Sequence, residues 1–306
     1  MTPTIRFVEP VCELIREPDL VRKVELAYRV CYKSESKISE SSKILVQRLA
    51  SSRGSDRHTS PLEHAWIKVI PPIEEAIALQ HLSTTNKYIS SSNNVLIGNF
   101  RAFHDLMIHE NVEGSLSRIN GTTALHALFY QLHITYPEVF PELPGVYGVD
   151  GWVIEEYNKY STFKIVTSRD ILQELVRHRT MSFSVESTRY CNYGNRGYEF
   201  VIPRPYEWAS DYDWEHPAVT DSSDMRDLFV ENCLATAWKY DTAIKNGTSP
   251  QEARMLLPGA LKTELYMTGT DKQWEQFLIL RDSKLAHPMI QYLAQSIKEQ
   301  LTSSQI

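Results

Sequence analysis

Apolar residues recur at helical spacing in several stretches of the chain. The apolar residues Leu20, Val21, Val24, Ala27, Val30 and Cys31 fall on one side of a helix, which predicts a helix with one buried side. The same periodicity predicts further helices over residues 42–50, 99–109, 122–134, 169–177, 225–245, 250–257, 271–280 and 287–301. Alternating apolar and polar residues predict strands over residues 65–70, 160–166 and 198–202.

These elements predict an α+β (mixed α/β) fold. We expect a single domain in which helices flank a central, mainly antiparallel sheet, and a C-terminal third that is mainly helical. Residues 137–151 are rich in proline and glycine and are predicted to form a loop. Gly145, Gly148 and Gly151 lie in that loop outside any strand–turn–helix context, so they do not form a dinucleotide-binding fingerprint.

The composition narrows the class of protein. The 306 residues are 42% hydrophobic and 23% charged, with a net charge of -6, which argues against non-specific nucleic-acid binding through a broad basic surface. The first residues lack a secretory signal, and the longest apolar stretches are shorter than a membrane span. Four scattered cysteines, Cys12, Cys31, Cys191 and Cys233, are typical of reduced thiols. We therefore expect a cytoplasmic protein without a membrane partner.

A cluster of basic residues is the first candidate for a functional site. Arg177, His178 and Arg179 are consecutive near the end of a predicted helix, and Arg189 follows in a stretch rich in hydroxyl groups. Guanidinium groups bind phosphate through two parallel hydrogen bonds, and hydroxyls can complete such a site. A salt-bridged cluster at a helix C-terminus explains the triplet equally well. The triplet alone leaves both interpretations open.

The longer sequence around the triplet distinguishes the ligand site from the salt-bridged cluster. Arg-His-Arg, then seven residues, then Ser187 and the run S-T-R-Y-C-N-Y to Tyr193 resembles the signature of flavin-dependent thymidylate synthases. Other stretches resemble motifs of the same family in the same order: A-Y-R-V-C-Y-K-S (27–34), H-T-S-P-L-E-H (58–64), P-Q-E-A-R-M-L-L-P (250–258), K-T-E-L-Y-M-T-G (262–269), W-E-Q-F-L-I-L-R (274–281) and A-H-P-M-I (286–290). The resemblance spans nearly the whole chain. It implies one domain over residues 1–306, with an insertion at about 75–158 as in the longer-chain members.

The resemblance implies a fold and an activity. The family has the thymidylate synthase-complementing fold and converts dUMP to dTMP, with 5,10-methylenetetrahydrofolate as carbon donor, FAD as hydride carrier and NADPH as reductant. Its members resemble one another in being homotetramers whose active sites lie at subunit interfaces. Small-molecule substrates are then the expected partners, with no nucleic acid. Flavin-dependent modification of another pyrimidine nucleotide and a non-catalytic nucleotide-binding relative are the alternatives.

The resemblance also implies roles for individual residues. The residues expected to contact FAD are Ser60, Arg177, His178, Arg179, Val185, Thr270, Lys272 and Gln276. Those expected to contact dUMP are Glu174, Arg177, Ser187, Thr188, Arg189, Arg254 and Arg281. Val185 stands where many members carry a polar side chain, and Thr270, Lys272 and Gln276 stand where relatives use asparagine or arginine.

Two residues are expected to take part in the chemistry. Arg281 matches the arginine that activates uracil, and a permanent guanidinium charge can stabilise negative charge near nitrogen-3 and oxygen-4 without a cysteine nucleophile. His58 can orient a ligand or move a proton near neutral pH, although a hydrogen-bonded loop histidine is the simpler interpretation. The spacing of His58, Glu63 and His64 fits no common metal-ligand pattern, so no metal is expected.

Overall fold

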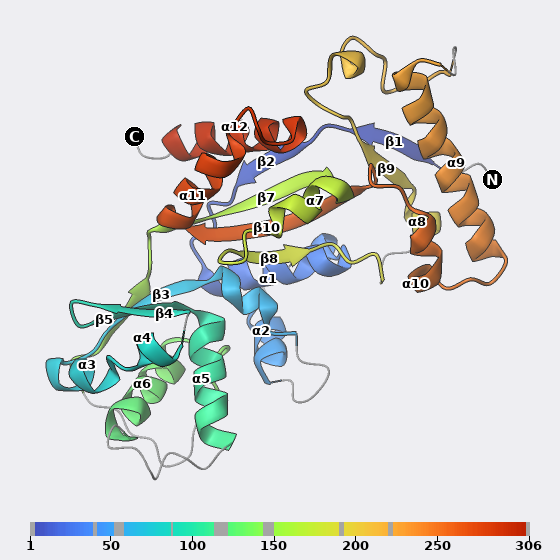
Figure 1. Ribbon diagram of the computed structural model, residues 1–306. Coiled ribbons are helices and arrows are strands. Elements are labelled where there is room, and N and C mark those ends of the chain that lie inside the picture. The colour runs from blue at the N-terminus through green and yellow to red at the C-terminus, as the bar shows by residue number, and fades with distance from the viewer. Residues whose placement is uncertain are drawn as a thin grey trace. The chain divides into compact units, whose positions relative to one another are not determined.

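The computed structural model of the chain describes residues 4–38, 42–51, 58–86, 88–112, 122–142, 150–189, 193–219 and 223–303 (Figure 1). The chain divides into two compact units. Unit 1 comprises Met1–Ile15, Val30–Ser34 and Ser161–Ile306, and unit 2 comprises Arg16–Arg29 and Glu35–Tyr160. One domain with an insertion at about 75–158 stays a prediction. The predicted loop over 137–151 falls partly outside the described residues, as does Cys191.

Unit 1 is built on a four-stranded sheet with the strand order β2-β7-β10-β8. These strands are β2 (Val11–Leu14), β7 (Tyr160–Ser168), β10 (Lys262–Thr270) and β8 (Ser182–Val185). β2 pairs with β7, and β10 pairs with β8, both antiparallel. A second, two-stranded sheet joins β1 (Ile5–Val8) to β9 (Tyr198–Val201) in parallel. The predicted mixed α/β class with mainly antiparallel pairing is confirmed.

Three helices of unit 1 bury their apolar residues with those of the four-stranded sheet. They are α7 (Arg169–Leu175), α11 (Asp271–Arg281) and α12 (Pro288–Ser303), and Figure 1 shows them beside β7, β10 and β2. Their shared core includes Ile171, Trp274, Phe277, Ile290, Leu293, Phe163, Ile165, Leu265 and Met267. Burial of so many large apolar side chains fixes the helices on the sheet, because each contributes about 1.5–3 kcal/mol relative to exposure. Two of these helices, α7 and α11, carry residues predicted for the site.

The C-terminal third is mainly helical, as predicted, but it also contains the strand β10, which the periodicity missed. It lies inside the sheet between β7 and β8, and every residue from Lys262 to Gly269 is buried. In the sequence, the charged residues Lys262 and Glu264 interrupt the continuous apolar run that normally indicates a buried strand. They are tolerated there because Lys262 Nζ donates to Glu264 Oε1 over 2.7 Å and also pairs with Glu199.

The remaining helices of unit 1 surround a second cluster of buried aromatic residues. They are α8 (Tyr193–Arg196), η5 (Glu207–Ala209), α9 (Met225–Lys245), α10 (Pro250–Ala253) and η6 (Arg254–Leu256). The helix predicted over 250–257 is therefore two short helices, which end before Pro258. Leu257 has ψ of 134° because a following proline disfavours the helical conformation.

Unit 2 contains its own antiparallel sheet with the order β4-β5-β3-β6. Its strands are β3 (Trp66–Ile70), β4 (Ile89–Ser92), β5 (Val95–Asn99) and β6 (Val153–Glu156). Its helices are α1 (Leu20–Tyr32), whose last three residues belong to unit 1, η1 (Glu35–Lys37), α2 (Ser42–Ser51), η3 (Ser60–His64), α3 (Ile73–Leu79), α4 (Leu82–Thr85), α5 (Phe100–Val112) and α6 (Thr122–Thr135). The helices predicted from residues 20, 42, 99 and 122 are confirmed. The β4–β5 hairpin, which the periodicity missed, turns at Asn93 and Asn94, both with positive φ.

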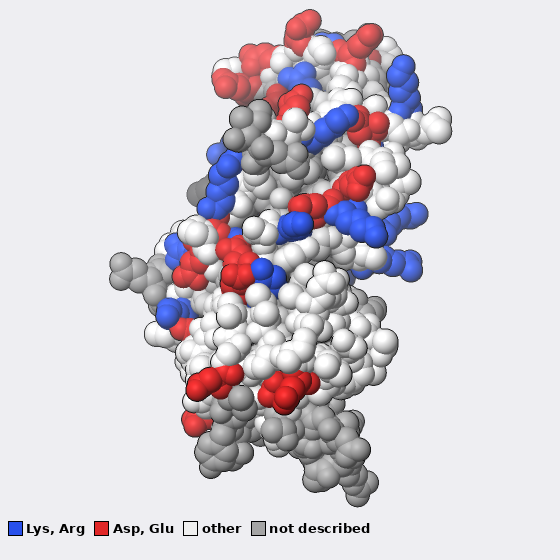
Figure 2. All heavy atoms as spheres, turned by 90° about the vertical axis from the view of Figure 1, so that its left-hand side faces the viewer, with Lys and Arg blue, Asp and Glu red and all other residues white. Residues whose placement is uncertain are grey.

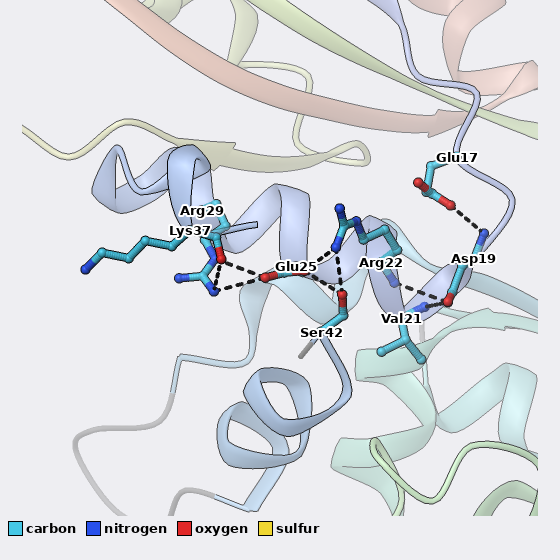
Figure 3. Close-up of polar contacts among 8 residues, drawn as sticks. All are labelled: Glu17, Asp19, Val21, Arg22, Glu25, Arg29, Lys37 and Ser42. Carbon is cyan, nitrogen blue, oxygen red and sulfur yellow. Dashed lines mark hydrogen bonds and ion pairs between the residues drawn. The ribbon is translucent and has the colours of Figure 1, made fainter. Parts of the chain in front are cut away.

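A buried carboxylate holds part of unit 2 together. Glu25 has a fully buried side chain and accepts hydrogen bonds from Arg22 at 3.1 Å, Arg29 at 3.0 Å and the Ser42 hydroxyl at 2.5 Å (Figure 3). Asp19 accepts from the Val21 amide at 2.8 Å and so caps the start of α1. The A-Y-R-V-C-Y-K-S motif thus contributes Arg29 to a structural ion cluster.

Two further observations concern membrane-spanning helices and surface charge. None of the helices in the described ranges is long and apolar enough to cross a membrane. Figure 2 shows basic side chains standing among acidic ones on the face that it displays.

Candidate functional site

The predicted triplet lies just beyond α7. The helix ends at Leu175, two residues earlier than predicted, so Arg177, His178 and Arg179 form the turn that leads to β8. The His178 amide donates to Leu175 O at 3.1 Å, and the Met181 amide donates to His178 O at 2.9 Å. Arg177 and Arg179 are exposed and His178 is half-buried. The turn therefore presents two guanidinium groups outward and one imidazole inward.

Three predicted site residues meet in a hydrogen-bonded cluster. Arg281, the last residue of α11, donates from Nη1 to Glu174 Oε2 at 2.8 Å and from Nη2 to the Glu174 carbonyl at 3.2 Å. Its Nε donates to His178 Nε2 at 2.9 Å. A guanidinium has five N–H donors, so this arrangement leaves two for a ligand. Only 18% of the Arg281 side chain is exposed, and its charge is therefore weakly screened by water.

The same contacts determine the protonation of His178. Burial and the neighbouring Arg281 guanidinium lower the pKa of His178 to about 4. The imidazole is then neutral at physiological pH and accepts at Nε2. Its ring also packs edge-on against Phe277, with 4.9 Å between the centroids. His178 thus orients Arg281 without adding a second positive charge.

The segment after β8 carries the predicted nucleotide-binding residues Ser187, Thr188 and Arg189. The Ser187 amide donates to Cys31 O at 3.1 Å, and the Arg189 amide donates to the Ser187 hydroxyl at 3.3 Å. Arg189 is exposed, and its Nε donates to Gln251 Oε1 on α10 at 3.2 Å. These bonds link the segment to α10, which precedes Arg254.

A cavity of about 710 Å³ brings Thr188 and Arg254 together. It is lined by residues from α7, the segment after β8 and the η6–β10 connection: Arg169, Asp170, Gln173, Thr188, Arg254, Met255, Leu257, Pro258 and Gly259. The mixture of cationic, amide, hydroxyl and apolar groups is typical of sites for small polar ligands. Arg169, Asp170 and Gln173 were missed by the sequence interpretation. Their only signal was their place on the helix that precedes the Arg-His-Arg triplet.

A buried network of charges lies next to the segment after β8 that carries the predicted nucleotide-binding residues. Glu264 pairs with Lys33, with Lys262 at 2.7 Å and with Lys164 at 3.1 Å. Although burial raises it, the hydrogen bonds from Lys262 and Lys33 lower the pKa of Glu264 to about 2. The network therefore keeps a charged carboxylate inside the sheet.

Glu186 joins that network to the segment. Its side chain is 3% exposed, accepts from the Tyr193 hydroxyl at 3.2 Å and lies 3.6 Å from Lys33 Nζ. Burial raises the pKa of Glu186, and Lys33 opposes that shift. Lys33 has a φ of 51°, an uncommon conformation for a residue other than glycine. The sequence interpretation gave Lys33 no role.

Seven of the eight predicted flavin contacts lie in unit 1, on the turn after α7, on β8 and at α11. Lys272 and Gln276 are exposed on α11, and Thr270 is its N-cap, where its amide donates to Gln273 Oε1 at 2.8 Å. Gln273 Nε2 donates to Thr180 O at 2.6 Å and so joins α11 to the turn that holds the triplet. Val185 is half-buried on β8 and packs against the apolar core. It offers a ligand no side-chain hydrogen bond.

His58 and Ser60 belong to unit 2. Ser60 begins the short helix η3, and the His58 ring lies 5.7 Å from the Tyr28 ring. Burial and the charge of Arg101 lower the pKa of His58. Arg101 itself pairs with Glu63 and with Asp105 at 3.3 Å. Within the described residues no group of three His, Cys, Asp or Glu side chains could hold a metal ion.

Part of the chain matches a known protein family. Residues 157–304 match the family model described as thymidylate synthase complementing protein. The flavin-dependent thymidylate synthase of Mycobacterium tuberculosis is 28% identical over 166 residues, which cover 53% of this chain and 64% of the relative. That of Geobacter sulfurreducens is 28% identical over 127 residues, which cover 42% of this chain and 49% of the relative. The chain thus spans less than two thirds of these relatives.

A solved structure with low similarity was also found. The flavin-dependent thymidylate synthase of Helicobacter pylori, complexed with FAD and dUMP, has 17% identity and a TM-score of 0.36, with 95% of this chain and 92% of that chain covered. The site of unit 1, with its arginines and hydroxyls around a cavity, is typical of an anion-binding α/β protein. Residues 157–304, the part of the chain that matches the family model, include every predicted site residue except His58 and Ser60.

Proposed function

We propose that the chain is a flavin-dependent thymidylate synthase that converts dUMP to dTMP, with methylenetetrahydrofolate as carbon donor and NADPH as reductant. One observation carries the proposal. Glu174, His178 and Arg281, all predicted for this reaction, form one hydrogen-bonded cluster inside the segment that matches the family. The names of the curated relatives give the same activity.

In this proposal Arg281 acts on the uracil ring. Negative charge must develop near nitrogen-3 and oxygen-4 before carbon-5 becomes nucleophilic, and the two unused N–H donors of Arg281 can stabilise that charge. Glu174 and His178 hold the guanidinium in place, so little reorganisation is needed as the charge develops. Arg254, Ser187, Thr188 and Arg189 bind the rest of the nucleotide, with Arg189 at the phosphate.

The residues predicted for FAD fit a phosphorylated cofactor. Arg177, Arg179 and Lys272 are exposed cations on the turn and helix that the Gln273–Thr180 bond joins. Such groups, with the amide of Gln276, provide the donors that a diphosphate requires. FAD, when bound, supplies the hydride chemistry. We propose that Ser60 and His58 complete the flavin and folate contacts and that the chain is a homotetramer with active sites at subunit interfaces.

Flavin spectroscopy and a tritium-release assay test the proposal. The purified chain is expected to bind FAD, to lose its visible flavin absorption with NADPH, and to release tritium from carbon-5-labelled dUMP only when methylenetetrahydrofolate is present. Mass spectrometry of the products from dUMP and from dCMP identifies the nucleotide. A chain that binds no FAD and releases no tritium contradicts the proposal. Light scattering coupled to size exclusion measures the oligomeric state.

A further inference from the structure

Gln273 on α11 is a residue that the predicted set of site residues leaves out. Its side-chain amide makes two hydrogen bonds: Oε1 accepts from the Thr270 amide at 2.8 Å, and Nε2 donates to Thr180 O at 2.6 Å. One partner is an N–H group and the other is a carbonyl, so only this orientation of the Gln273 amide satisfies both. The first bond caps the start of α11, and the second reaches the turn that carries the Arg-His-Arg triplet.

Gln273 belongs to a row of three residues on one face of α11. Gln273, Phe277 and Arg281 are each four positions apart, which places them one above another along the helix. Phe277 packs edge-on against the His178 ring, and Arg281 donates to His178 Nε2. The row runs forward along α11 while its partners run back from Thr180 to His178. The turn therefore lies antiparallel along this face of the helix.

The pairing of strands explains why the turn and the start of α11 meet. β10 leads directly into α11, and the turn leads into β8, which pairs with β10 so that Thr268 stands opposite Ser182. The Met181 side chain occupies the space where a Cβ of Gly269 would stand, so the two segments are also in close contact just beyond that pair. The Gln273 bond continues this attachment from the sheet towards the triplet.

The position of the turn matters because of the charges that it carries. Arg177 and Arg179 are exposed on the turn, and Lys272, the neighbour of Gln273, is exposed on α11. A diphosphate bound by all three needs them at one separation, and groups that are already in place lose less conformational entropy on binding. Resting on the proposed function, we propose that Gln273 is a positioning residue, which holds the Arg-His-Arg turn on α11 and so sets the spacing of the cations that bind the phosphates of FAD.

Two replacements of Gln273 separate positioning from helix capping. Gln273→Glu keeps an acceptor for the Thr270 amide but has no N–H for Thr180 O, and it adds a negative charge. Gln273→Met loses both hydrogen bonds and adds no charge. The loss of the bond to Thr180 is the one change that the two variants share.

Titration of the full-length chain with FAD, followed by flavin fluorescence, measures the effect. Both variants are expected to bind FAD about threefold to tenfold more weakly than the wild type, which is the range for one hydrogen bond. Gln47→Glu and Gln47→Met, at an exposed residue of α2, are the matched controls and should bind FAD like the wild type.

The pattern of losses decides between the explanations. A loss in Gln273→Met alone indicates that only the cap matters, and a loss in Gln273→Glu alone indicates an effect of charge. Either result overturns the inference, as does unchanged binding in both variants. Where Gln273→Met does not fold, by its circular dichroism spectrum, Gln273→Glu is compared with the wild type at low and high NaCl concentration. A weakening that persists in high salt supports the inference, and one that disappears is an effect of charge and overturns it.

The imidazole of His178 provides a second measurement that does not need FAD. Because burial and the neighbouring Arg281 lower the pKa of His178 to about 4, NMR titration of the wild type should give this value. In both Gln273 variants the turn is held less firmly on α11, so the pKa of His178 should rise towards 6.5. If the wild-type chain binds no FAD, the proposed function is contradicted and this titration decides: a raised pKa in both variants supports the positioning role, and an unchanged pKa overturns it. Normal tritium release with unchanged FAD affinity and unchanged His178 pKa in both variants overturns the inference alone.

Discussion

Arg281 donates a hydrogen bond from its Nε to the Nε2 of His178 across 2.9 Å, although the two residues are 103 positions apart in the chain. The bond requires an unprotonated Nε2, and the lowered pKa of His178, about 4, satisfies this at neutral pH. The pair therefore carries one positive charge, on the guanidinium. This relationship places a fixed cation at the end of α11, where the proposed reaction needs one.

Replacing Arg281 tests its electrostatic role. Arg281→Ala is expected to lower the rate of tritium release from labelled dUMP at least about 100-fold, because removal of one group that stabilises developing charge typically costs that much. Lys298→Met is the matched control on α12, since Lys298 is 59% exposed and pairs with Asp282 at the surface. Unchanged turnover in Arg281→Ala would show that another group activates the uracil.

The charge network around Glu186 and Glu264 predicts that removing one of its cations lowers the stability of the protein. Lys33→Met leaves Glu186 and Glu264, which are 3% and 10% exposed, without one of their cations. Removing one partner of a buried ion pair lowers the free energy of unfolding by about 3–5 kcal/mol. Urea denaturation measures this loss. Arg6→Gln, which breaks an exposed pair with Glu199, is expected to cost less than about 1 kcal/mol. Equal effects of the two changes would contradict the structural role of Lys33.

The buried His64 predicts a dependence of stability on pH. Burial lowers the pKa of His64 from 6.5 to about 3. Below pH 6.5 the unfolded chain takes up a proton that the folded chain does not, so the unfolding free energy falls as the pH decreases. The loss from this residue is about 2 kcal/mol between pH 6.5 and pH 5, at 1.36 kcal/mol per pH unit.

Urea denaturation at pH 7, 6 and 5 measures this dependence. His64→Gln is less stable at pH 7, but its stability should fall less steeply over the same range, because the variant lacks the titrating group. His216→Gln, at a residue whose side chain is 81% exposed, is the control and should keep the slope of the wild type. Identical slopes for His64→Gln and the wild type would exclude His64 as the source.

The cysteines predict a reaction without a thiolate nucleophile. Burial raises the pKa of Cys12 to about 12 and of Cys233 to about 12, so both are protonated thiols at neutral pH. Cys12→Ala, Cys31→Ala, Cys191→Ser and Cys233→Ala are each expected to keep tritium release within about threefold of the wild type, after correction for folded protein. Loss of turnover in Cys191→Ser, with normal flavin absorption, would instead indicate a nucleophilic cysteine.

Local patterns predicted the helices well and the strands less well. α1, α9 and α12 follow from apolar periodicity, because one side of each helix is buried and the other is exposed. β10 was not predicted because it is buried on both faces and contains two charged residues, Lys262 and Glu264. Their charges are compensated by each other and by residues far away in the chain. Residues 153–156 and 182–185 are strands too short for a periodic signal.

By itself the sequence determined which side chains are available and in what order their motifs occur. The motif from Arg177 to Arg189, with Arg254 and Arg281 downstream, already resembled that of flavin-dependent thymidylate synthases. Only the tertiary structure decided that Arg281 contacts Glu174, 107 residues away, and that Arg169 shares a cavity with Arg254. The physical reason is that helical periodicity arises from neighbours along the chain, whereas these contacts depend on α7 and α11 packing into one buried core with the sheet.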